Sequence, residues 1–81
     1  MNNEVEVRYF AAARAAAGVD NARFSPAPLA SIIADACSNN PALSHVISQC
    51  SFLVDSVVVH NENIQINAGS VVDVLPRFAG G

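Results

Sequence analysis

The sequence predicts an α+β fold, in which a mixed sheet carries a helix on one of its faces. Short runs rich in β-branched and aromatic residues lie towards both ends of the chain, whereas the middle repeats apolar residues every three or four positions. The first pattern is typical of strands and the second of helices. The 81 residues suffice for one domain, and 52% hydrophobic with only 14% charged residues excludes intrinsic disorder.

The first third of the chain predicts two strands joined by a short helix. Residues 5–10 alternate with a period of two, as a strand does. Ala11–Ala17 is a run of strong helix formers, and Gly18 ends it. Residues 21–25 predict a second strand beside the first, and the prolines that follow end this strand.

The middle of the chain predicts two amphipathic helices that are separated near Asn39–Pro41. The apolar face of the first consists of Leu29, Ile32, Ile33, Ala36 and Cys37. The apolar face of the second consists of Leu43, Val46, Ile47 and Cys50. Both cysteines therefore fall on apolar helix faces, which favours buried, reduced thiols. A disulfide or a reactive thiol is the alternative.

The last third of the chain predicts short strands separated by polar turns. The expected extended segments are Phe52–Val54, Val57–Val59, Ile64–Ile66 and a final strand Val71–Leu75 that Pro76 ends. The first and last strands are the most apolar, so we expect them to be neighbours at the centre of the sheet. With the helix from Leu29 covering one face, the arrangement is a β-grasp domain.

Charge and hydropathy exclude several classes of function. The net charge is -3 and the four basic residues, all arginines, are spread along the chain, which argues against nucleic-acid binding. No stretch approaches the ~20 apolar residues that span a bilayer. Arg14 interrupts the alanine-rich run, and acidic residues precede it, so the run does not resemble a signal peptide. We expect a cytoplasmic protein with no membrane partner and an unprocessed N-terminus.

Catalytic and metal-binding patterns are absent from the sequence. His45 and His60 have no cysteine or carboxylate at the spacing of metal ligands, so no metal site is predicted. The phosphate-binding glycine motifs are missing as well. The carboxylates are scattered, and Asp73 is interpreted as an outward-facing residue of the last strand. We therefore expect a protein that is not itself an enzyme and that binds no cofactor tightly.

The most informative feature is the end of the chain, Gly80–Gly81. A terminal glycine pair can thread extended through a narrow channel, because glycine has no Cβ. The hypothesis is that the carboxylate of Gly81 is the reactive group, with Gly80 as a spacer. Residues 1–76 would form the β-grasp domain and residues 77–81 a flexible tail. The alternative is a frayed end without function.

Two segments resemble a known family. Residues 7–14 (VRYFAAAR), followed by Gly18, resemble the N-terminal signature of the small, sulfur-carrier subunit of molybdopterin synthase, and residues 68–81 (AGSVVDVLPRFAGG) resemble its C-terminal signature. The Gly-Gly end is shared with the thiamine-pathway carrier and other ubiquitin-like sulfur carriers, whereas the first segment is closer to the molybdopterin branch. The chain departs from the family at Arg77, where a second proline is frequent, and at Ser70, where aspartate is frequent.

The resemblance implies a carrier subunit without catalytic activity of its own. An E1-like enzyme would use ATP to adenylate Gly81, and a sulfur donor would convert the acyl-adenylate into a thiocarboxylate. The carrier would then dock on the large synthase subunit, within a heterotetramer, and give its sulfur to a pterin precursor. Phe78 and Leu75 are the expected apolar docking contacts, although Leu75 is equally compatible with the core. Arg77 is expected to meet an acidic patch or a substrate phosphate, or else only solvent.

Three other functions stay open. The same carboxylate chemistry would serve thiamine or cysteine synthesis, with a different partner. A ubiquitin-like modifier is a further hypothesis, although a chain without lysine cannot be extended into lysine-linked polymers. The last alternative is a binding module in which the two glycines have no function.

Overall fold

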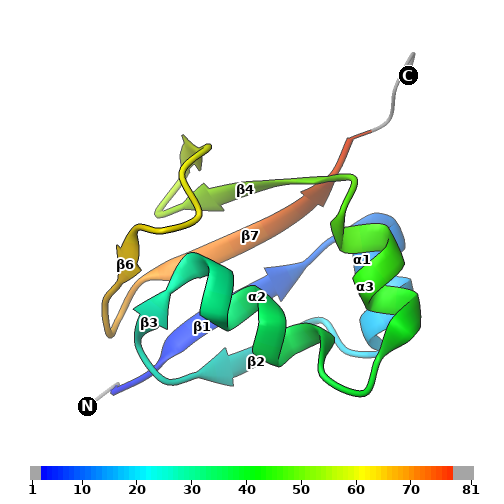
Figure 1. The fold of residues 1–81 in the computed structure, drawn as a ribbon, viewed down its shortest axis with the longest axis horizontal. Coiled ribbons are helices and arrows are strands. Elements are labelled where there is room, and N and C mark those ends of the chain that lie inside the picture. The colour runs from blue at the N-terminus through cyan, green and yellow to red at the C-terminus, as the bar shows by residue number, and fades with distance from the viewer. Residues whose placement is uncertain (1–2, 78–81) are drawn as a thin grey trace.

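The computed structural model describes residues 3–77. Its helices and strands follow the predicted order except for the two-residue strand β3, which lies where the prolines were expected only to end the second strand (Figure 1). They are β1 (Val5–Tyr9), α1 (Ala11–Ala17), β2 (Asn21–Phe24), β3 (Ala27–Pro28), α2 (Leu29–Cys37), α3 (Pro41–Ile47), β4 (Cys50–Val54), β5 (Val57–Val59), β6 (Gln65–Ile66) and β7 (Val71–Pro76).

The main sheet has five strands in the order β2-β1-β7-β4-β5, and β3 and β6 form a separate pair. β1 and β7 lie side by side and run parallel, with Val7 opposite Val72, while the other pairs in the sheet are antiparallel. β7 is the central strand (Figure 1). The prediction that the first and last strands are neighbours in the middle of the sheet is therefore confirmed.

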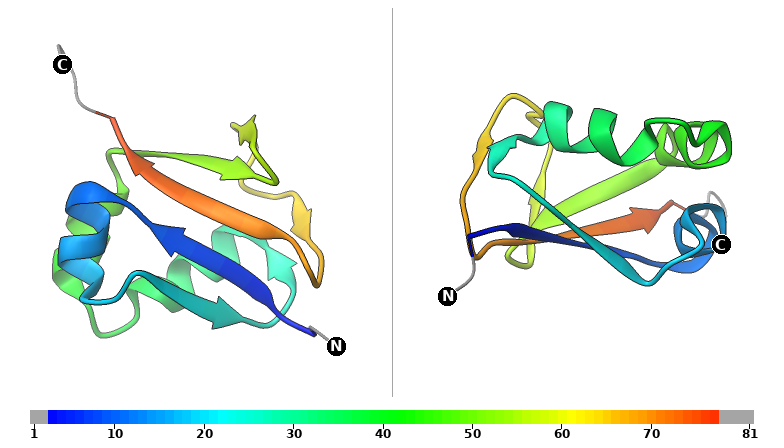
Figure 2. Two further views of the ribbon diagram at one scale, coloured as in Figure 1. Left: turned by 180° about the vertical axis from the view of Figure 1, so that it is seen from behind. Right: turned by 90° about the horizontal axis from the view of Figure 1, so that it is seen from below.

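The hydrophobic core lies on the face of the sheet that α2 and α3 cover (Figure 2). Alternate residues of the central strands point into it, because successive side chains of a strand lie on opposite faces. The core includes Val5, Val7, Tyr9, Leu29, Ile32, Leu43, Phe52, Ile66, Val72 and Val74, all buried. The predicted helix on one face is confirmed.

Two caps hold the short helices where the sequence places them. Gly18 adopts φ 79°, and its N–H donates to the Arg14 carbonyl at 2.9 Å, so it ends α1 as predicted. Asn40 caps α3 by accepting the Leu43 N–H at 3.0 Å, and its amide donates to the Ala16 carbonyl at 3.1 Å. This one side chain therefore begins α3 and ties it to the end of α1.

Two sequence predictions require correction. Cys50 does not lie on the second helix: α3 ends at Ile47, and Cys50 is the first residue of β4, opposite Pro76. The helical spacing was misleading because Cys50 also fits the period-two pattern of the buried residues in β4. Cys50 is nevertheless buried, whereas Cys37 is only half-buried, and neither forms a disulfide. Pro76 does not stop the last strand before itself but is its final residue.

Candidate functional site

The candidate site begins where β7 releases the chain. Pro76 has no N–H, yet the sheet accommodates it. The N–H groups of a strand alternate in direction, and the Arg77 N–H points to the β4 side, where it donates at 2.9 Å to the carbonyl of Gln49, the residue before β4. A backbone N–H at position 76 would therefore point towards β1, which has already ended at Tyr9. Proline thus costs the sheet no hydrogen bond at this position.

Phe78, Gly80 and Gly81 lie outside the described residues, and their predicted roles stay predictions. What the structure provides is the position of the strand that leads to them. β7 is held on both sides, by β1 and β4, as far as Val74, and by β4 alone as far as Arg77. The last strand of the described chain therefore lies in the centre of the sheet and not at a loose edge (Figure 1).

Leu75 lies outside the hydrophobic core. Its neighbour Val74 is 1% exposed and points into the core, so strand alternation places Leu75 on the other face, where it is half-buried opposite Ser51. We call this other side of the main sheet the open face, because neither α2 nor α3 covers it (Figure 2). The core interpretation of Leu75 therefore does not hold, and its role as a docking contact stays a prediction.

The register places a row of side chains across the open face. Arg8 stands opposite Asp73, Asp73 opposite Leu53, and Leu53 opposite Val58. Val58 is 52% exposed. Phe10 and Leu75 lie on the open face as well. Its apolar side chains therefore surround one ion pair, that of Arg8 with Asp73.

The pairing of Arg8 with Asp73 was missed by the sequence analysis. Arg8 Nε donates to Asp73 Oδ1 at 2.6 Å, and Nη2 donates to Oδ2 at 2.9 Å, so the contact is bidentate. These hydrogen bonds, together with the charge of Asp73, raise the pKa of Arg8 above its usual value. Asp73 does face outward as predicted, yet only 8% of it is exposed. The signal was available, since two charges of opposite sign occupy the apolar strands predicted to be neighbours.

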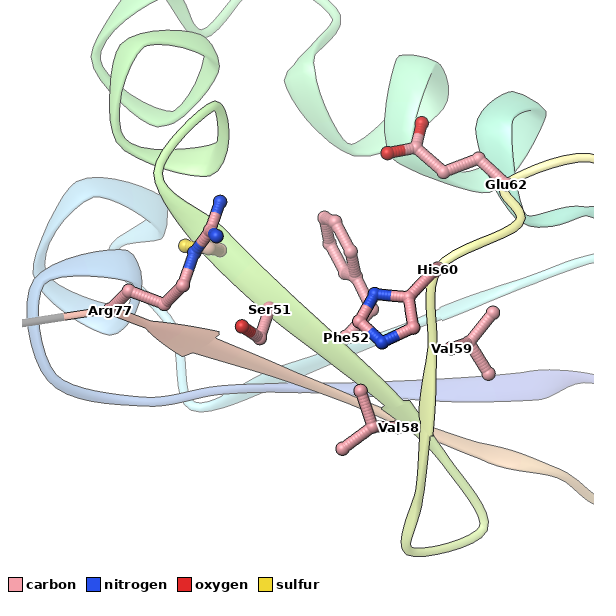
Figure 3. Close-up of a pocket in the computed structure, with 8 residues that line it drawn as sticks. Ser51, Phe52, Val58, Val59, His60, Glu62 and Arg77 are labelled. Atoms are coloured by element: carbon pink, nitrogen blue, oxygen red, sulfur yellow. The ribbon is translucent and has the colours of Figure 1, made fainter.

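A recess of about 180 Å³ lies beside the point where the chain leaves the sheet. Figure 3 shows Arg77 at one end and His60 with Val58 at the other, with Ser51 between them. Its remaining lining residues are Cys50, Phe52, Val59 and Glu62. Arg77 thus faces a recess that is lined by both polar and apolar side chains. Among residues 3–77 its guanidinium forms no ion pair.

The thiol of Cys50 lines this recess but is poorly suited to nucleophilic chemistry. Burial raises its pKa, the charge of Arg77 opposes that shift, and Cys37 adds a smaller rise. The thiol also donates a hydrogen bond to the Val46 carbonyl, with a sulfur to oxygen distance of 3.4 Å. A protonated, buried thiol reacts slowly. The geometry therefore favours a structural role for Cys50.

Within residues 3–77, no three side chains of the types that bind metals come together. None of the helices described has the length and hydropathy needed to cross a bilayer.

Comparison with known proteins gives a family match and several similar structures. The model of the ThiS family matches residues 7–81, which includes the terminal glycine pair. A comparison with curated protein sequences found no match.

Three similar solved structures illustrate the fold. A putative molybdopterin converting factor subunit 1 from Pyrococcus furiosus has a TM-score of 0.81 at 22% identity, covering 93% of this chain and 98% of that one. The small archaeal modifier protein 1 from Methanosarcina acetivorans also gives 0.81 at 22% identity, covering 100% and 99%. A chain from a complex of subunits 1 and 2 of the molybdopterin-converting factor from Helicobacter pylori gives 0.75 at 23% identity, covering 96% and 99%. These likenesses confirm the predicted ubiquitin-like β-grasp fold.

Proposed function

Because the chain belongs to the ThiS family, we propose that it is the small sulfur-carrier subunit of molybdopterin synthase, with Gly81 as the sulfur-bearing residue. The observation that carries the proposal is the family match, since it extends through both terminal glycines. The position of β7 supports it, because the strand that leads to the terminal residues is held in the centre of the sheet as far as Pro76. The signature in residues 7–14 favours the molybdopterin branch.

The proposed chemistry takes place at the terminal carboxylate. An oxygen of the Gly81 carboxylate attacks the α-phosphorus of ATP in an E1-like enzyme, which gives an acyl-adenylate and releases pyrophosphate. A hydrosulfide equivalent from a sulfur donor then attacks the carbonyl carbon. The bond from that carbon to the phosphate oxygen breaks, AMP leaves with the electron pair, and a thiocarboxylate remains. The domain itself contributes no catalytic group and holds no cofactor; ATP is consumed by the activating enzyme.

The open face is the proposed docking surface for the large synthase subunit, in a heterotetramer. Leu75 lies on it beside the exit of the chain, and Phe78 is proposed to extend the contact along the tail. A few anchoring side chains carry most of the binding free energy at an interface, and aromatic ones are frequent among them. Arg77 is proposed as the polar contact at the edge of the interface. A cytoplasmic location is part of the proposal, because the activating enzyme would consume ATP.

The direct test is the intact mass of the carrier after incubation with its activating enzyme, ATP and inorganic sulfide. We expect a species in which one oxygen is replaced by sulfur. An unchanged mass, with an enzyme that releases pyrophosphate on another carrier, would overturn the proposal.

Deletion of Gly81 provides the matched control. The variant should form no thiocarboxylate, because the carboxylate then lies one residue short of the activating site. Its thermal midpoint should equal that of the full chain, since no core residue is changed. A shortened carrier that still accepts sulfur would show that the position of the glycine carboxylate is not what the enzyme recognises.

A second candidate function is that of a protein modifier. The similarity to the small archaeal modifier protein 1, over the whole of this chain, favours it. The same acyl-adenylate would then react with an amine of a target protein. Peptides in which Gly81 is joined to a target lysine would identify this function by mass spectrometry. A carrier for thiamine or cysteine synthesis would share the thiocarboxylate and differ only in the partner that it binds.

A further inference from the structure

A second recess lies where β1 gives way to α1. It has a volume of about 230 Å³ and is lined by Arg8, Tyr9, Phe10, Arg14, Asp20 and Asn21. The lining contains two arginines and one aspartate, and Arg8 is paired with Asp73 beside it. None of the proposed steps at the end of the chain uses these residues.

The guanidinium of Arg8 is held in one orientation at this recess. Its bidentate contact with Asp73 engages two of the five N–H groups that a guanidinium carries. The ring of Phe10 lies beside it, 5.8 Å from ring centroid to Cζ. The side chain of Arg8 is nevertheless 47% exposed, and in the described residues its guanidinium makes no other hydrogen bond. Arg8 therefore offers an oriented set of free donors, and little conformational entropy is lost when an acceptor binds.

Arg14 is the second cation of the recess and is held only loosely. Its Nε lies 3.9 Å from Asp20 Oδ1, and the two side chains are 61% and 81% exposed. An exposed ion pair at this distance is weak. Arg14 is thus free to turn from Asp20 to an acceptor placed beside Arg8.

The surroundings of the recess indicate which ligand it fits. Arg8 belongs to the same row of the open face as Leu53 and Val58, so a protein that covers those apolar side chains also removes water from Arg8. A donor that loses water without gaining an acceptor is costly. A carboxylate supplies two acceptor oxygens and the opposite charge, which matches two neighbouring guanidinium groups.

We propose that this recess receives the carboxylate of an aspartate or glutamate from the protein that docks on the open face, and that Arg8 determines specificity there. The inference rests on the proposed function only in naming that protein as the large synthase subunit. It assigns to Arg8 and Arg14 a role separate from that of the terminal glycines.

The test is isothermal titration of the large synthase subunit into the carrier and its variants. Arg8→Gln should bind at least about thirtyfold more weakly, as expected when one partner of a buried charge pair is truncated. His45→Gln, which changes an exposed residue of α3 on the opposite side of the sheet from the open face, should bind as the unmodified carrier does. The affinity of Arg8→Gln should also depend less on salt concentration.

A paired variant separates binding from folding. Arg8→Gln leaves Asp73 without its partner, so the double variant Arg8→Gln/Asp73→Asn restores a neutral pair. It should recover the thermal midpoint while binding stays weak. Binding of either variant equal to that of the unmodified carrier, or an equal loss with His45→Gln, would overturn the inference alone. A carrier that forms no thiocarboxylate and does not bind the large subunit would overturn the proposed function and this inference with it.

Discussion

Val74 and Leu75 are adjacent in β7 but lie on opposite faces of the sheet, so truncating each should have a different consequence. Val74 is 1% exposed. Val74→Ala removes two buried methyl-sized groups, each of which contributes ~0.8 kcal/mol to stability, and it also leaves a cavity. We expect a loss of about 2–3 kcal/mol in the free energy of unfolding. For a domain of this size that lowers the thermal midpoint by about 10–20 °C.

Leu75→Ala should behave in the opposite way. Leu75 is half-buried and outside the core, so water can occupy the space that it leaves, and we expect a loss of about 1 kcal/mol or less. Docking should suffer instead: the dissociation constant for the large synthase subunit should rise about tenfold or more, as for an apolar interface anchor. Val74→Ala, measured well below its midpoint, should dock normally.

Differential scanning calorimetry and isothermal titration on the same samples give both quantities. The pattern expected is a stability defect confined to Val74→Ala and a docking defect confined to Leu75→Ala. If Leu75→Ala melted as early as Val74→Ala and docked with unchanged affinity, Leu75 would be a core residue and the assignment of the open face would be wrong.

Two further predictions concern stability. Asn40→Ala should lower the free energy of unfolding in urea by about 2 kcal/mol, because it removes the cap of α3 and the hydrogen bond to α1. Asn61→Ala is the control: it loses only a hydrogen bond in an exposed turn and should cost at most ~0.5 kcal/mol. Burial raises the pKa of Tyr9, Cys37 and Cys50, so the unfolded chain loses these protons at a lower pH than the folded chain does. The stability present at neutral pH should therefore fall as the pH rises through the ordinary thiol pKa of about 8.5. Urea titrations at neutral and alkaline pH check this, and a stability that rose with pH would contradict it.

The sequence predicted the elements well where a local pattern decides them. Gly18 ends α1 because a left-handed residue is needed there, and the alternation of β1 is visible in residues 5–9 alone. Cys50 shows the limit of this approach. Its position satisfies both a helical and an extended spacing, and only its pairing with Pro76 across the sheet selects the strand.

The candidate site divides in the same way. The terminal glycines and the family signature are features of the amino-acid order itself, so the proposed chemistry of Gly81 needs no tertiary structure. The contact of Arg8 with Asp73 joins residues 65 positions apart, and no local pattern encodes that distance.

The sequence by itself determined the order and type of most elements, although not β3 or the start of β4, and it determined the central position of the first and last strands and the nature of the chain end. These follow from side-chain periodicity and hydrophobicity, which act over a few residues. Only the tertiary structure decided which face Leu75 occupies, that Arg8 is oriented by Asp73, and that two arginines share one recess. Strand register decides these features, because a shift by one residue would turn every side chain of β7 to the other face.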